Sequence, residues 1–206
     1  MPLLAPHIFF GLDLGRRQDP SAISILERLH DKTSLLDRTS FEVEHELRFV
    51  LRHVETFPLG THYFEIVRRI RNLVHGAGPL KTLVVDASGV GAPIVEAFRA
   101  VRLGASLIPI TITGSGHPHA DPHGGYLVPR RDLISNLRIM MERGLLKIPP
   151  SIHAKDALIK ELIHLKDHQV NHHDDLAISL TLAAWQSTRG INHLMDCGRS
   201  FTGPRL

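Results

Sequence analysis

The sequence predicts one α/β domain in which a mixed sheet of five strands is flanked by helices. Three observations predict this class. Three strand-like segments open the chain, helix-like and strand-like segments alternate after them, and helices close it. A hydrophobic content of 43% is enough to build a core around such a sheet. We expect the first three strands to be antiparallel and the later strands to be parallel.

The first three expected strands form a meander. Residues 7–15, HIFFGLDLG, are a short apolar run closed by Gly15, which is typical of a buried central strand. Residues 21–29 and 33–44 alternate in polarity and carry β-branched side chains, which favours two further strands. Asp31 and Lys32 would supply the turn between them.

Helices and buried strands are expected to alternate after the meander. Residues 62–76 place apolar side chains at helical spacing and end at Gly76. The nearly all-apolar segments 81–88 and 106–114 predict buried parallel strands. A helix over 91–104 lies between them, and helices are expected over 131–144, 154–166 and 174–190. We interpret 115–131 as a loop rich in Gly, Pro and His, with room for a hairpin at 124–131.

The expected domain covers residues 1–189, and residues 190–206 form a patternless tail that we expect to be flexible. The formal charge of +3 is compatible with a polyanionic partner. A single cysteine, Cys197, excludes an intramolecular disulfide and fits a reducing compartment. No apolar stretch reaches the length of a membrane span, and the N-terminus lacks a basic leader. We therefore expect a cytoplasmic protein with no membrane partner.

Carboxylates stand at the ends of three expected core elements. Asp13 and Asp86 come late in two apolar strands, while Asp174 and Asp175 begin an apolar helix. If the two strands are parallel neighbours, their ends meet at one edge of the sheet. Buried carboxylates in contact repel each other unless a cation bridges them. Hard oxygen ligands suit Mg²⁺ or Mn²⁺, so the pattern predicts a divalent metal site.

Four segments in this order resemble the C-terminal nuclease domain of phage terminase large subunits, which has the ribonuclease H-like fold. The resemblance covers residues 7 to about 187. The segments are GLDLGRRQDPSAISIL, LVVDASGVGAPIVEAFR, YLVPRRDLISNLRIMMERGLLKIP and HHDDLAISLTLAAW.

The resemblance implies an endonuclease that cleaves double-stranded DNA with two Mg²⁺ or Mn²⁺ ions. By motif, Asp13 would be the first-strand ligand that bridges both ions, and Asp86 the ligand on the next parallel strand. Asp175 would be the third ligand, with Asp174 as an auxiliary ligand or water-orienting group. The sequence leaves open which of these two points inward. His173 would contact the metal-bound water or the scissile phosphate.

Four arginines are candidate contacts to the DNA backbone. Arg16 and Arg17 follow the first ligand strand, and Arg130 and Arg131 precede a helix. Such contacts give affinity without sequence information and weaken as salt rises. Arg68, Arg69 and Arg71 are interpreted as a solvated helix face.

The sequence departs from packaging terminases in one respect. It contains no G-x-x-x-x-G-K-[ST] loop, so an ATPase motor is not implied. The chain is then either an excised nuclease domain or a stand-alone relative of it, and we expect the stand-alone relative. It would act on DNA, with a separate ATPase or phage packaging component as a further candidate partner.

Three other interpretations stay open. A structure-selective nuclease of the Holliday-junction resolvase kind shares the fold and metals but usually has a glutamate where Asp86 stands. A catalytically silent DNA-binding or assembly module of phage origin is the second. The third is a zinc site at His117, His119, Asp121 and His123, which lacks cysteine, and in a chain with 15 histidines chance explains such a cluster.

Overall fold

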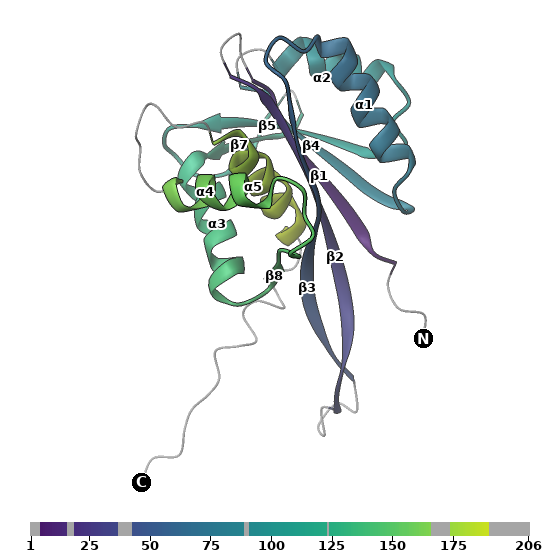
Figure 1. Ribbon diagram of the computed structural model, residues 1–206, viewed down its shortest axis with the longest axis vertical. Helices are drawn as coiled ribbons and strands as arrows, with labels where there is room; N and C mark the ends of the chain where they lie inside the picture. The colour runs from purple at the N-terminus through teal and green to yellow at the C-terminus, as the bar shows by residue number, and fades with distance from the viewer. Residues whose placement is uncertain are drawn as a thin grey trace.

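The computed structural model describes residues 5–15, 19–36, 43–88, 91–122, 124–165 and 174–189. In this part of the chain the strands form one mixed sheet of eight, in the order β6-β7-β5-β4-β1-β2-β3-β8 (Figure 1). Helices cover both faces of the sheet, which confirms the predicted α/β class. The expected tail, 190–206, lies outside the described residues. No helix in the described ranges combines the length and the apolar character needed to span a bilayer.

The first three strands are antiparallel, as predicted, but the boundary between the second and third is shifted. The strands are β1 (His7–Asp13), β2 (Ser21–Leu36) and β3 (Val43–Phe57). The turn predicted at Asp31 and Lys32 is wrong, because β2 continues through both residues and pairs them with Glu46 and His45. A long two-stranded ladder satisfies the backbone hydrogen bonds, so polar residues need not end the strand there.

The central part of the chain follows the predicted alternation of helices and strands. β4 lies parallel to both β1 and β5, so β1 has a parallel neighbour on one side and the antiparallel β2 on the other. The elements are α1 (Tyr63–His75), β4 (Leu80–Asp86), α2 (Gly91–Ala100) and β5 (Ser106–Thr113).

Three short strands that the sequence analysis did not count extend the sheet at its edges. β7 (Tyr126–Pro129) adds parallel to β5, and β6 (His119–Ala120) pairs with it as a hairpin. β8 (Leu146–Lys147) adds parallel to β3. The predicted number of five strands is therefore too low. Segments of two to four residues are too short to show a period, and pairing with an existing edge is what makes them strands.

The two faces of the sheet carry different helices. Side chains of β1, β4, α1 and α2 form one apolar core, which includes Phe10, Leu83, Ile70 and Phe98. On the other face, α3 (Arg130–Glu142), α4 (Lys155–His164) and α5 (Asp175–Thr188) complete a second layer (Figure 1). α5 is buried around almost its whole circumference, because it packs on the sheet and against the other two helices, and most of its side chains are apolar.

Candidate carboxylate site at the carboxyl edge of the sheet

Strand register brings Asp13 and Asp86 to one edge of the sheet. Leu12 pairs with Val85 in the parallel ladder, so the next residue along each strand is an aspartate. Side chains alternate between the two faces of a strand. Phe10 and Leu12 belong to the core under α1 and α2, which turns the intervening positions of β1 toward α5. The same alternation along β4, where Val85 faces α1 and α2, turns Asp86 toward α5.

Close packing of α5 on β1 brings a third carboxylate to the same edge. A Cβ on Gly11 would lie 1.9 Å from the Ser179 carbonyl oxygen, so the helix backbone contacts the strand directly. Asp175 is one helical turn before Ser179, about 6 Å along the axis. Asp13 is two residues beyond Gly11, also about 6–7 Å. The step from Ser179 to Asp175 along α5 and the step from Gly11 to Asp13 along β1 both lead toward the carboxyl edge of the sheet. Asp175 is 9% exposed.

Asp174 and Asp175 have different surroundings, which answers the question that the sequence left open. Asp175 is buried on the helix face that packs against β1. Asp174 is the residue before the helix, makes no capping hydrogen bond, and keeps 33% of its side chain exposed. Its carboxylate accepts a hydrogen bond from the guanidinium of Arg130 at the start of α3. Asp175 is therefore the inward residue of the pair.

The four carboxylates form one electrostatic unit. Burial raises the pKa of Asp13 well above its usual range, and the charges of Asp86, Asp175 and Asp174 raise it further. Arg130 acts in the opposite direction. Asp13 itself is only 9% exposed. Taken together, three separate elements bring negative charge to one buried position, where it is unfavourable without a compensating cation.

Asp86 also organises the chain after β4. Its Oδ1 accepts a hydrogen bond from the Ser88 N–H at 2.7 Å, and the Ser88 hydroxyl accepts one from the Ile112 N–H at 2.8 Å. Since the second bond ties this segment to β5, the end of β4 is held in place.

The remaining sequence-predicted site residues are placed in different ways. Arg16, Arg17 and His173 lie outside the described residues. Arg131 is exposed and donates to the Gly116 carbonyl oxygen at 2.7 Å. Of the histidine-rich loop, His119 donates to the His117 carbonyl oxygen, and His123 lies outside the described residues. Within the described ranges, no group of three or more His, Cys, Asp or Glu side chains, the four aspartates of the carboxylate site included, is arranged to hold a metal ion.

Glu161 is a residue of the site that the sequence analysis missed. Its Oε2 accepts a hydrogen bond from the Ala177 N–H at 2.9 Å, which ties α4 to the first turn of α5. Burial raises the pKa of Glu161 to about 7, although the N–H groups of Ala177 and Leu176 act to lower it. No local signal marks Glu161, because its partner is 16 residues away along the chain.

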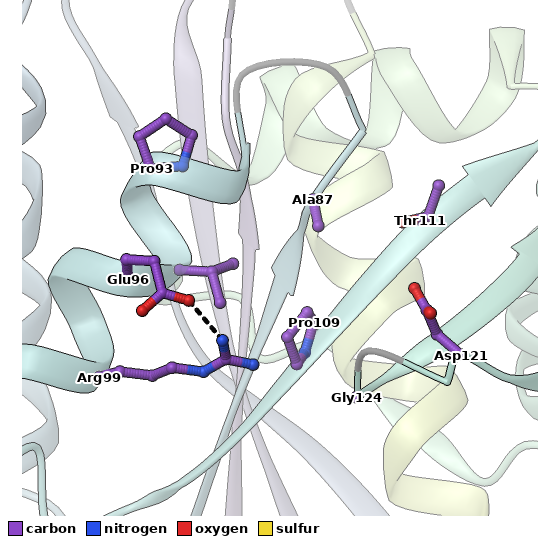
Figure 2. A pocket seen from close by; sticks show the side chains of 9 residues that line it. Ala87, Pro93, Glu96, Arg99, Pro109, Thr111, Asp121 and Gly124 are labelled. Carbon is purple, nitrogen blue, oxygen red and sulfur yellow. Dashed lines mark hydrogen bonds and ion pairs between the residues drawn. The ribbon is translucent and has the colours of Figure 1, made fainter.

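A cavity of about 440 Å³ lies on the opposite face, behind the end of β4. Figure 2 shows Ala87, next to Asp86 in the chain, and the Glu96–Arg99 ion pair of α2. None of the four site aspartates lines this cavity. The carboxylate site and the cavity are thus separated by the sheet.

Comparison with solved structures identifies the fold. The chain is similar to a variant nuclease domain of the large terminase subunit gp2 of the bacterial virus Sf6, which was solved with manganese and β-thujaplicinol. The TM-score is 0.57 at 11% identity, over 86% of this chain and 87% of that one. It also matches RuvC of Thermus thermophilus, with a TM-score of 0.40 at 12% identity, over 87% and 92% of the two chains. No protein-family model and no curated protein matches the sequence. The ribonuclease H-like fold predicted from the four motifs is confirmed.

Proposed function

We propose that this protein is a divalent-metal-dependent endonuclease that hydrolyses phosphodiester bonds of DNA. The observation that carries the proposal is the convergence of Asp13, Asp86 and Asp175 from β1, β4 and α5 at one edge of the sheet. Groups with strongly shifted pKa values gather at functional sites more often than elsewhere. The similarity of the fold to a terminase nuclease domain supports the choice of reaction.

The donor set fits Mg²⁺ or Mn²⁺ by its chemistry. All four groups are carboxylates, and burial with mutual repulsion makes Asp13 costly to ionise alone. Among the described residues, the metal-free arrangement is not that of a metal cluster. In the proposal, Asp13, Asp86 and Asp175 draw together around two ions when these bind, and Asp174 assists. Ions bound there would supply a water nucleophile of lowered pKa and stabilise charge on the leaving oxygen.

The protein's own residues have three further tasks in this proposal. The aspartates hold their charge on the α5 side of the sheet, which fixes the face that DNA must approach. Arg130 and Arg131, at the N-terminus of α3, are proposed to contact backbone phosphates, together with Arg16 and Arg17. His173 is proposed to contact the attacking water or the scissile phosphate.

Double-stranded DNA is the proposed substrate. The proposal does not assign an ATPase activity to the described residues. The sequence has no phosphate-binding Gly-Lys loop, so any ATP-driven step that accompanies cleavage would come from a separate ATPase or packaging component. Cleavage itself is proposed to need neither.

Nicking of supercoiled plasmid in Mg²⁺, in Mn²⁺ and in EDTA tests this function. Cleavage is expected with either metal and not in EDTA, with ends that DNA ligase can rejoin. Asp13→Asn and Asp86→Asn should each lower the rate roughly 100-fold or more, because each removes a proposed metal ligand. Asp156→Asn, which changes an exposed aspartate of α4, is the control and should cleave normally.

Two results would contradict the proposal. Cleavage that persists in EDTA, or in folded Asp13→Asn protein, would show that the carboxylate site is not the catalytic one. DNA binding without cleavage under every metal condition would instead favour the silent DNA-binding module.

A further inference from the structure

The first turn of α5 is capped by a side chain from another helix. The first N–H groups of a helix have no partner inside the helix. A Ser, Thr, Asp or Asn before the first turn often supplies a side-chain acceptor. In α5 that residue is Asp174, which makes no such bond. Glu161 of α4 accepts the Ala177 N–H instead, at 2.9 Å.

Because Glu161 accepts from the first turn, Asp174 is not needed as the cap of α5. The Asp174 carboxylate turns to Arg130 on α3. Asp175 lies on the face of α5 that packs against β1 and is 9% exposed. Glu161 bonds the residue two positions after Asp175, so it restrains the backbone that carries both carboxylates.

A mobile first turn would have direct consequences for the site. Helix ends fray more readily than helix centres, and a frayed turn would let Asp175 move relative to Asp13 and Asp86. The Ser24–Ser179 hydrogen bond, at 2.6 Å, holds α5 to the sheet one turn further along. The Glu161 bond to Ala177 adds a restraint on the first turn itself, and this restraint comes from α4 rather than from the sheet.

We propose that Glu161 is a positioning residue for the carboxylate site: by capping α5 in trans, it keeps Asp175 near Asp13, from where both can close around divalent cations. This inference rests on the proposed function. Groups that orient metal ligands from a distance affect metal affinity about 10–100-fold when they are removed.

Direct binding of Mn²⁺ tests the proposal without relying on activity. Calorimetry on the full chain would compare the wild type with Glu161→Ala, Glu161→Gln and Glu142→Ala. Glu142 is an exposed glutamate of α3 paired with Arg138, so its removal controls for the loss of one negative charge. Glu161→Ala should weaken Mn²⁺ binding about 10-fold or more. Glu161→Gln keeps a carbonyl acceptor for the Ala177 N–H and should restore most of the affinity.

Amide hydrogen exchange provides a second readout that needs no metal. In Glu161→Ala, the amides of Leu176 and Ala177 should exchange faster than in the wild type, while amides in the centre of α5 keep their protection. In Glu161→Gln the Ala177 amide should stay protected. A role in folding alone would instead change protection along the whole helix.

The outcomes separate a failure of the proposed function from a failure of the positioning role. If the wild type binds no Mn²⁺, the proposed function fails and this inference fails with it. If the wild type binds Mn²⁺ and Glu161→Ala binds it equally well, only the positioning role is overturned. If Glu161→Gln loses as much affinity as Glu161→Ala despite a protected Ala177 amide, Glu161 acts through its charge or as a ligand, and the capping role is wrong.

Discussion

At the residue scale, the site is defined by the electrostatic cost concentrated on Asp13. Burial and three neighbouring carboxylates all disfavour its ionised form, and Arg130 offsets only part of this cost. Natural proteins retain such unfavourable groups where function requires them, at some expense of stability. Asp13 is therefore expected to lower the stability of the metal-free protein.

Asp13→Asn should make the metal-free protein more stable by about 1–2 kcal/mol, because the amide removes the repulsion with the other carboxylates. The measurement is urea unfolding at pH 7.5 in EDTA, with Asp156→Asn as the unchanged control. Saturating Mn²⁺ should reverse the order, since only the wild type gains binding free energy. A less stable Asp13→Asn protein in EDTA would contradict this account of the site.

Glu161 should make the metal-free protein less stable as the pH rises through the range in which it titrates. Its pKa moves from 4.5 to about 7 on folding, so the folded state binds the proton more tightly than the unfolded state. The unfolding free energy should therefore fall between about pH 4.5 and 7 and then level off. After discounting for partial exposure, we expect Glu161 to contribute about 2 kcal/mol to this fall.

Urea unfolding in EDTA between pH 5 and 8 measures this effect by comparing the wild type with Glu161→Gln. The variant cannot ionise at this position, so its curve should be flatter by the stated amount. Parallel curves for the two proteins would show that Glu161 keeps an ordinary pKa when folded.

At the element scale, α5 is the element that assembles the site, and both of its ends are held by other elements. Glu161 accepts from its first turn, and Arg28 of β2 donates to the Ser187 carbonyl oxygen at 3.0 Å near its last. Between them, Gly11 lets the helix backbone lie directly on β1. The position of Asp175 therefore depends on contacts along the whole helix.

Gly11→Ala should destabilise the protein by about 3 kcal/mol and weaken Mn²⁺ binding, because an added Cβ would lie 2.8 Å from the Ala183 nitrogen and closer still to the Ser179 oxygen. Thermal unfolding and Mn²⁺ calorimetry measure the two effects. Gly78→Ala is the matched control, because nothing lies within 4 Å of its added Cβ, and it should change stability by less than about 0.5 kcal/mol. A stable Gly11→Ala protein would mean that α5 is not seated as described.

At the scale of the whole molecule, the sheet separates two surfaces with different expected roles. The carboxylates face the α3–α5 layer, whereas α1 and its exposed arginines cover the other face. In the proposed function, DNA that reaches the site contacts the α3 side. Which face of the protein binds DNA can be tested in EDTA, without measuring cleavage.

DNA binding in EDTA should weaken with salt, and Arg131→Ala should lower the slope of log K against log salt by about 1, as expected for one lost phosphate contact. Arg68→Ala, on α1, should leave the slope unchanged. Fluorescence anisotropy with a linear duplex gives both values, and a four-way junction in parallel tests for structure selectivity. A larger effect of Arg68→Ala would place the DNA on the other face.

The sequence alone determined the order of the main elements and the three places where carboxylates meet the core. Apolar runs and helical spacing are local properties, so β1, β4, β5 and the helices could be predicted. The extent of β2 and the three edge strands could not, because a strand of that kind is defined by its partner and not by its own period.

Only the tertiary structure decided which aspartate of the Asp174–Asp175 pair points inward, and what holds each in place. These outcomes depend on Gly11, Arg130 and Glu161, which meet α5 or its first residues from distant parts of the chain. The local sequence gives two adjacent residues at the start of a helix nearly equal tendencies to point toward the core. The choice between them is therefore made by packing and by charge in three dimensions, where sequence spacing carries no information.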